Sequence, residues 1–137
     1  MLRFFLNLDP PTVTQQEHRV GVSKSGKPYV YEDARLADAR EKLTAYLNQH
    51  RPDSPMDGPI ALTVVWFFRS DVHRDGEWKI TKPDTDNLNK MLKDCMTQLG
   101  FWHDDAQVCR ELIMKQWVRR EPPGILITLW PERPDGA

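Results

Sequence analysis

The sequence has few cysteines, almost no net charge and no long apolar run, and each shortage excludes a class of protein. Cys95 and Cys109 are the only cysteines among 137 residues, and neither belongs to a CxxC pair. We therefore expect no disulfide framework, and a reducing, cytoplasmic location is the simplest interpretation. The apolar start MLRFFLNLDPP is too short for a signal peptide or a membrane span, so no membrane partner is expected.

The motifs of several common chemistries are also missing. No G-x-x-x-x-G-K-[ST] loop and no G-x-S-x-G turn occurs, which argues against P-loop and hydrolase-elbow enzymes. Cys95, His103 and Cys109 do not have the spacing of a zinc finger or ribbon, and there is no obvious fourth ligand. A calcium loop that begins at Asp84 would need a glycine and a glutamate where the chain has Asn89 and Cys95.

The net charge of −1 counts against a dedicated DNA-binding protein unless the basic side chains are segregated along the chain. They fall in three stretches, two of which flank a run of aspartates. A surface that follows DNA phosphates is one interpretation, and a plain solvated face is the other. The candidate DNA contacts are Arg19, Lys24 and Lys27 in the first stretch, Arg69, Arg74, Lys79 and Lys82 in the second, and Arg110 in the third.

Length and composition indicate one domain that spans residues 1–137. With 39% hydrophobic and 28% charged residues, the composition is that of a globular protein. We expect a loose tail over 131–137. The expected strands are 2–8, 60–68 (central and buried on both faces) and 125–130, the expected helices are 32–49 and 84–99, and SKSGK at 23–27 is expected at a hairpin tip.

The stretch Val108–Val118 has two interpretations. Its apolar residues fit a helical period. However, the EPPG turn and the strand-like ILITLW that follow favour a strand within a terminal hairpin. The pattern alone leaves both interpretations open.

The clearest element is the second helix. Its apolar residues form one stripe, Asp84 or Asp86 can cap its start, and Gly100 can close its end. The stripe consists of Leu88, Met91, Leu92, Cys95, Met96 and Leu99.

Aspartates occur at both ends of this helix, in PDTDNLNK at 83–90 and in GFWHDDAQ at 100–107. At ~100° per residue, Asp86, Lys90 and Asp94 line one edge of the helix, and Asp104 and Asp105 follow its end. A hard divalent ion would relieve the repulsion among such carboxylates and could ionise a water beside a phosphodiester. A nearby lysine could neutralise charge on the phosphate. The alternative is that these residues are only helix caps and surface pairs.

PDTDNLNK, followed by a helix and GFWHDDAQV, resembles the RusA family of Holliday-junction resolvases, which are endodeoxyribonucleases of bacteria and their phages. The match is tight over 82–108 and covers most of the chain more loosely. The resemblance implies a small α+β domain, in which a mixed or antiparallel sheet is packed with two main helices. It also implies that this domain acts as a homodimer on four-way junction DNA. It implies symmetric paired nicks that depend on Mg²⁺ or Mn²⁺, a bacterial or phage-encoded cytoplasmic protein, and a strand over Val108–Val118.

The resemblance also implies roles for individual residues. Asp84, Asp86 and Asp105 match the family's metal-binding catalytic carboxylates, and Lys90 matches its active-site lysine. Two further residues, Asn87 and Asp104, match supporting positions. His103 stands where the family often has an apolar residue, and the overall charge is more acidic than a junction-binding protein would suggest.

Three alternatives stay open at this point. The first is a nuclease with the same chemistry that acts on other branched DNA. The second is a protein that binds DNA junctions without cleaving them. The third is a structural or interaction protein whose aspartates are only caps and surface pairs.

Overall fold

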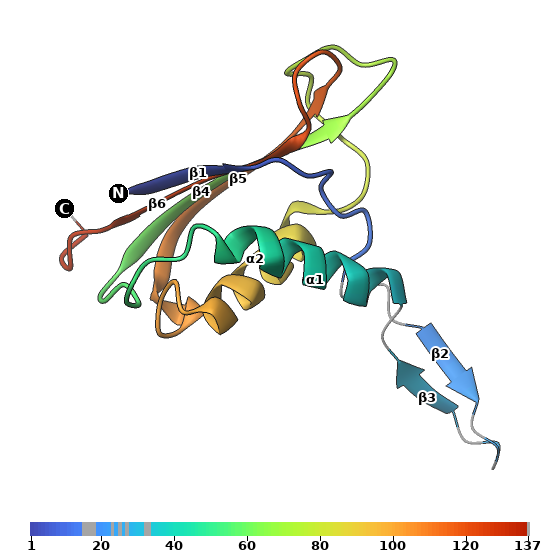
Figure 1. Cartoon of the computed structure of the whole chain (residues 1–137), viewed down its shortest axis with the longest axis horizontal. Coiled ribbons are helices and arrows are strands. Elements are labelled where there is room, and N and C mark those ends of the chain that lie inside the picture. The colour runs from blue at the N-terminus through green and yellow to red at the C-terminus, as the bar shows by residue number, and fades with distance from the viewer. Residues whose placement is uncertain (15–18, 23, 25, 27, 32–33, 137) are drawn as a thin grey trace.

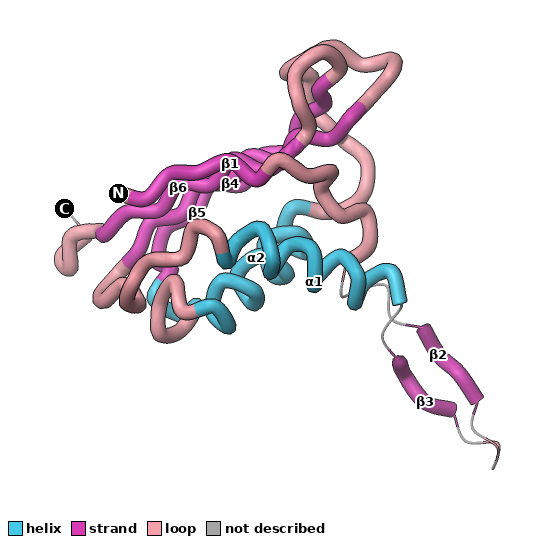
Figure 2. Tube along the Cα trace, in the orientation of Figure 1, coloured by secondary structure: helices cyan, strands magenta, loops and turns pink. Residues whose placement is uncertain are grey.

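A four-stranded sheet with two helices on one face forms the body of the protein (Figure 1). The computed structural model describes residues 1–14, 19–22, 24, 26, 28–31 and 34–136. Figure 2 shows the helices side by side under the strands. The elements of this body are β1 (Leu2–Leu6), α1 (Ala34–Asn48), β4 (Ile60–Arg69), α2 (Thr85–Leu99), β5 (Val108–Val118) and β6 (Gly124–Pro131). The predicted α+β class, with a mixed sheet and two main helices, is confirmed.

Strand β4 lies at the centre of the sheet, whose order is β1-β6-β4-β5. It pairs antiparallel with β6 and parallel with β5. Leu62, Val64 and Trp66 are buried on the side of the helices, and Ala61 and Val65 are buried on the opposite side. The prediction of a central strand buried on both faces is therefore confirmed.

The expected terminal hairpin is wrong, although Val108–Val118 is a strand as predicted. β5 and β6 do not pair with each other, because β4 lies between them. The chain passes from β4 through α2 to β5, and such a crossover returns a strand parallel to the one it left. β4 takes the centre because it is apolar on both faces, whereas β5 leaves Leu112 56% exposed at the sheet edge.

The apolar stripe of α2 packs into the core between α1 and the sheet. Trp102 follows this helix and is 1% exposed, and its indole N–H donates to the Thr97 hydroxyl at 2.7 Å. The helix ends as predicted at Gly100, whose positive φ of 79° suits a residue without a side chain. The buried residues of the two helices are Leu36, Leu43, Leu47, Leu88, Met91, Leu92, Cys95 and Met96, together with the polar Asn89.

The N-terminal third of the chain departs from the predicted boundaries in small ways. β1 ends at Leu6 rather than Leu8, and a Cβ on its neighbour Gly124 would overlap the Phe5 ring and the Leu6 carbonyl. α1 begins at Ala34, and the predicted start at residue 32 lies outside the described residues. The predicted hairpin consists of β2 (Arg19–Val22) and β3 (Pro28–Tyr31), which pair antiparallel and extend away from the helices in Figure 1.

No helix among the described residues is long and apolar enough to cross a membrane.

Candidate active site

Asp84 begins α2 through its backbone and leaves its carboxylate unused. Its backbone is extended, with φ −73° and ψ 150°, and its carbonyl accepts from the Leu88 N–H at 3.1 Å. Its side chain makes no capping hydrogen bond and is exposed. The interpretation of Asp84 as only a helix cap is therefore not supported, and the carboxylate is available to a ligand.

Asp86 lies in the first turn of the same helix, where the helix dipole favours a negative charge. Its Oδ1 accepts from the backbone N–H of Asn87 at 3.0 Å, and its side chain is exposed. Asn87 is half-buried beside it. Asp84 and Asp86 thus present two carboxylates at one helix end.

Lys90 forms an ion pair with Asp94, one helical turn farther along α2. Lys90 Nζ lies 3.1 Å from Asp94 Oδ1. The hydrogen bond and charge of Asp94 raise the pKa of Lys90, and the charge of Asp105 raises this pKa further. The ammonium therefore stays protonated near neutral pH, so Lys90 can stabilise negative charge but cannot serve as a base.

The two members of the second aspartate pair have different environments. Asp104 caps the short 3₁₀ helix η1 (Asp105–Gln107), and its Oδ1 accepts from the Ala106 N–H at 2.9 Å. Asp105 is half-buried, and its charge acts on Lys90 of α2. The capping role therefore falls to Asp104, and Asp105 is the member whose charge acts on the lysine.

Gln107 fixes this second pair to the rest of the molecule. Its Oε1 accepts from the backbone N–H groups of His103 at 2.7 Å and Asp104 at 3.0 Å. Its Nε2 donates to the carbonyls of Met56 and Gly58, each at 2.9 Å. One side chain thus ties the GFWHDDAQ segment to the loop that precedes β4.

His103 is directed at Asp57, with 2.7 Å between Nε2 and Oδ1, and both side chains are well exposed. It also borders a cavity of about 350 Å³ beside α2. Asp94, Asp104 and Asp105 line the same cavity. Three acidic side chains therefore share one hollow, which Arg40 of α1 also lines.

The carboxylates lie in two groups rather than one. Asp84 and Asp86 stand at the start of α2, and Asp105 stands beside Asp94 farther along the helix. Within the part of the chain that the structure describes, no three His, Cys, Asp or Glu side chains form a group that could hold a metal ion. The donor chemistry nevertheless fits Mg²⁺, which binds oxygen ligands and often uses only one or two carboxylates with waters and substrate phosphate.

A polar contact missed by the sequence reasoning fixes α2 against β5. Asn89 is 5% exposed, and its Nδ2 donates to Glu111 Oε2 at 2.9 Å. Lys93 Nζ lies 3.3 Å from the same oxygen. These contacts fix the orientation of α2 about its own axis, and Lys90 lies between the two residues that make them. No pattern in the sequence indicates them, because they join residues on separate elements.

Lys79 differs from the other candidate DNA contacts because it is buried. It is 7% exposed, and its Nζ donates to the Thr81 hydroxyl and to the Lys82 carbonyl, each at 2.6 Å. An ammonium enclosed in this way is directed at the protein's own backbone. Its placement does not support the predicted contact with DNA.

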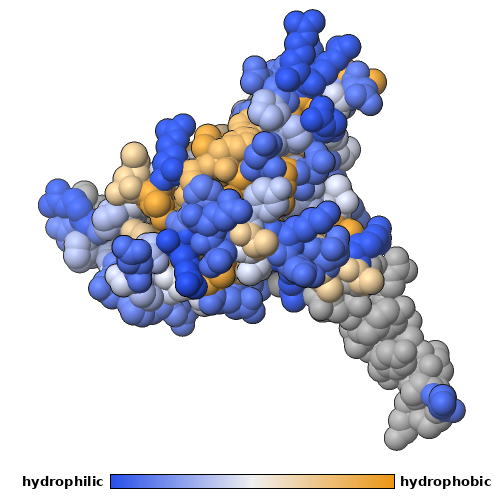
Figure 3. Space-filling view, in the orientation of Figure 1, coloured by the Kyte–Doolittle hydropathy of each residue, from blue (hydrophilic) through white to orange (hydrophobic). Residues whose placement is uncertain are grey.

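The remaining basic candidates fall on separate parts of the molecule. Figure 3 shows mainly hydrophilic residues over the protrusion formed by the loops that follow β4 and β5. Arg74 lies 3.8 Å from Glu77, and Arg110 lies 3.4 Å from Glu132. Exposed candidates are Lys24, Arg69, Arg74, Lys82 and Arg110, whereas Arg19 belongs to β2 and Lys27 lies outside the described residues.

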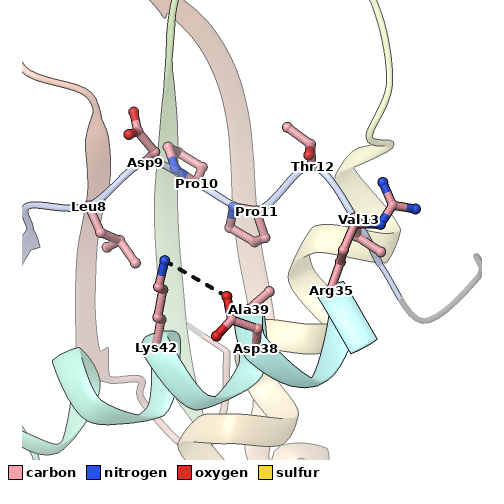
Figure 4. Close-up of a pocket in the computed structure, with 10 residues that line it drawn as sticks. All are labelled: Leu8, Asp9, Pro10, Pro11, Thr12, Val13, Arg35, Asp38, Ala39 and Lys42. Carbon is pink, nitrogen blue, oxygen red and sulfur yellow. Dashed lines mark ion pairs between the residues drawn. The ribbon is translucent and has the colours of Figure 1, made fainter. Parts of the chain in front are cut away.

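A second cavity, of about 220 Å³, lies between the chain that follows β1 and helix α1 (Figure 4). The Lys42 ammonium points toward the Asp38 carboxylate, 3.8 Å away. Asp9, next to Pro10 on the other side of the cavity, is exposed and points away from the lysine. No aspartate of PDTDNLNK or GFWHDDAQ lines this cavity, so it is separate from the candidate active site.

Together, the fold and the site define a small α+β domain that displays carboxylates and a protonated lysine from one helix. The chain belongs to the RusA family, because the family model described as Endodeoxyribonuclease RusA matches residues 10–130. A similar protein is the Crossover junction endodeoxyribonuclease rusA of Lactococcus phage r1t. It is 34% identical over 109 residues, which cover 77% of this chain and 80% of the phage protein.

A second similar protein is the Uncharacterized protein YqaN of Bacillus subtilis strain 168. It is 26% identical over 114 residues, which cover 74% of this chain and 79% of YqaN. The resemblance inferred from PDTDNLNK and GFWHDDAQV is thus confirmed at the level of the family.

Proposed function

We propose that this protein is an endodeoxyribonuclease that resolves Holliday junctions by symmetric paired nicks. Membership of the RusA family and the similarity to a phage crossover junction endodeoxyribonuclease support the proposal. The observation that carries it is the uncapped, exposed carboxylate of Asp84 at the start of the helix that also bears a protonated Lys90.

Asp84, Asp86 and Asp105 are the proposed ligands of Mg²⁺ or Mn²⁺. Such an ion supplies an activated water and neutralises charge on the scissile phosphate. Asp84 and Asp86 offer oxygen donors at the helix start, and Asp105 offers a further one beside Lys90. A site with only a few carboxylate ligands suits an ion that completes its coordination with substrate phosphate.

Lys90 has an electrostatic role in the proposed reaction. Its raised pKa keeps the ammonium charged, so it stabilises the negative charge that develops on the phosphate. Asp94 holds the ammonium at 3.1 Å and limits the directions it can take. Asn87 and Asp104 support the site through the local backbone rather than through the phosphate.

A homodimer is the proposed working form. A four-way junction presents two opposed strands for cleavage, and a two-fold symmetric dimer would carry one active site for each strand. The proposed phosphate contacts are exposed Arg69, at the end of β4, and exposed Arg74 and Lys82, on the loop that leads into α2. Binding that depends on such contacts weakens as salt rises, through the release of counterions.

A cleavage assay tests the function. Purified protein is mixed with a labelled four-way junction, a flap and a linear duplex of matched sequence, each with Mg²⁺, Mn²⁺ or chelator. The expected result is paired nicks in the junction alone, and only with metal. Equal cleavage of the flap would favour a general branched-DNA nuclease. Junction binding without cleavage in either metal would contradict the proposal and favour a binding protein.

A further inference from the structure

Two lysines from different elements meet behind the segment that enters α2. Lys79 Nζ donates to the Thr81 hydroxyl at 2.6 Å, to the Lys82 carbonyl at 2.6 Å and to the Thr81 carbonyl at 3.4 Å. Lys115 Nζ, from β5, donates to the carbonyls of Thr81 at 2.8 Å and Pro83 at 2.9 Å. Every residue from Thr81 to Pro83 is thus held by an ammonium group, immediately before Asp84.

Backbone pairing with β5 turns Lys79 inward. The Lys79 N–H donates to the Lys115 carbonyl at 3.1 Å, and the Trp117 N–H donates to the Glu77 carbonyl at 2.8 Å. The Lys79 ammonium then lies over two aromatic rings, 4.4 Å from the Trp117 centroid and 5.1 Å from the Phe68 centroid. The side chain is therefore fixed at both its backbone and its charged end.

This arrangement is costly for stability alone. Burial lowers the pKa of Lys79, and the like charge of Lys115 lowers it further. Among the described residues, no carboxylate lies within ion-pair distance of either ammonium, so only carbonyls, a hydroxyl and aromatic rings compensate the two charges. Buried charges are weak evidence for stabilisation, because apolar residues often replace them without loss. Lys79 is buried and Lys115 is half-buried, and both donate to the same short segment, which indicates a task other than stabilisation.

The segment they hold controls the direction of Asp84. Asp84 has no side-chain capping bond that would fix its carboxylate locally. Its position therefore depends on the path of the backbone through Thr81, Lys82 and Pro83. A side chain that fixes the neighbours of a metal-binding group commonly changes metal affinity or activity roughly 10–100-fold when it is removed.

We propose that Lys79 and Lys115 are positioning residues, which clamp Thr81–Pro83 to the edge of the sheet and so fix the carboxylate of Asp84. This inference rests on the proposed function, since it concerns a residue of the proposed metal site. The two lysines touch neither the DNA nor the metal. Their effect is on how well the acidic site binds a divalent ion, not on how well the protein binds a junction.

Lys115→Met tests the inference, because methionine keeps most of the length of the side chain and loses the charge and both hydrogen bonds. Three quantities are measured on wild type and variant: Tb³⁺ affinity by luminescence, the Mg²⁺ concentration for half-maximal junction cleavage, and junction affinity in chelator. We expect the two metal measurements to weaken roughly 10–100-fold. Junction affinity in chelator should stay at the wild-type value. Lys115→Arg, which retains donors, should recover part of the metal affinity.

Lys82→Met is the matched control, because it removes an exposed positive charge from the same segment without removing a clamp. It should weaken junction affinity and leave Tb³⁺ affinity unchanged. Should Lys115→Met lower the thermal midpoint so far that it is unfolded in the assay, Thr81→Val replaces it. That variant removes only the 2.6 Å bond to Lys79 and should weaken Tb³⁺ binding to a smaller extent.

The outcomes separate this inference from the proposed function. A wild-type protein that neither binds Tb³⁺ nor cleaves junctions would refute the proposed function. A wild type that does both, with folded Lys115→Met and Thr81→Val variants of unchanged metal affinity, would overturn only the clamp. Loss of junction affinity in chelator for Lys115→Met would also overturn it, because the lysine would then contact DNA.

Discussion

The protein has two acidic segments, Pro83–Asp86 and His103–Gln107, and different side chains fix the backbone of each. In the first segment, Lys79 and Lys115 hold backbone carbonyls just before Asp84. In the second, Gln107 holds two carbonyls of the loop before β4 and two N–H groups of its own segment. Each segment is thus fixed by long polar side chains that reach backbone groups elsewhere in the fold.

The difference lies in where the aspartates are used. Asp104 is committed to a cap, and a capping box with Gln107 completes the turn. Asp84 occupies the corresponding capping position of α2 and makes no such bond. A helix start that leaves its cap residue unbonded gives up about 1 kcal/mol of stability, which supports the proposed role of Asp84 as a metal ligand. Asp105 differs from Asp104 in the same way, because the side chain of Asp104 forms the cap of η1.

Within the second acidic segment, the largest expected effect is that of Asp105→Asn. The carboxamide retains the shape and loses the charge, so we expect junction cleavage to fall about 1,000-fold, through the loss of several kcal/mol of metal-derived stabilisation. Asp104→Asn is the paired variant, and its cleavage should fall much less. Single-turnover cleavage rates at saturating Mg²⁺ measure both. Equal losses in the two variants would remove the distinction between the aspartates.

Lys90→Met should have the next largest effect. Removal of a positioned positive charge is expected to slow cleavage by about 100-fold, with junction affinity in chelator nearly unchanged. The measurement is the cleavage rate with protein in excess over junction. The exposed Lys42, which pairs with Asp38 on α1, provides a control through Lys42→Met. If both variants slow cleavage equally, Lys90 contributes only through the net charge of the protein, and the proposed role of its position is wrong.

Gln107→Ala tests the fixation of the second segment. The substitution deletes the four hydrogen bonds of the Gln107 amide. We therefore expect the free energy of unfolding to fall by about 2 kcal/mol. Urea denaturation followed by tryptophan fluorescence measures the change. A free energy of unfolding equal to that of wild type would show that the segment is held by its packing alone.

The smallest expected effect separates the two capping positions. Asp104→Ala should lower the free energy of unfolding by about 1 kcal/mol, since it removes a formed cap. Asp84→Ala should lower it by less, because no side-chain cap is lost. The same denaturation experiment measures both, and a larger loss for Asp84→Ala would contradict the assignment of its carboxylate as uncommitted.

Local pattern was sufficient for much of the fold. The stripe from Leu88 to Leu99 predicts α2, Gly100 predicts its end, and the apolar run from Ile60 predicts the central strand. These predictions succeed because periodicity and caps are properties of neighbouring residues. Cys95 likewise lies in the core as a residue of the stripe.

Local sequence patterns did not predict the contacts between separate elements of the fold. The pairing of β4 between β5 and β6 depends on which strand is most apolar on both faces, and a turn-like EPPG does not reveal it. The burial of Lys79 depends on its register against Lys115, and the pairing of Lys90 with Asp94 depends on the rotamers of both residues. The resemblance, by contrast, predicts the family through two motifs at a set separation, and the roles of the acidic residues stay a prediction.

The most direct measurement is the mapping of nicks in a four-way junction by wild-type protein and by Asp84→Asn, with Mg²⁺ and with chelator. Wild type should cut the two opposed strands at symmetric positions, only with metal, and Asp84→Asn should bind the junction and leave it intact. Nicks by Asp84→Asn at the wild-type rate, or no nicks by wild type in either Mg²⁺ or Mn²⁺, would contradict the assignment of Asp84 to a metal-dependent resolving site.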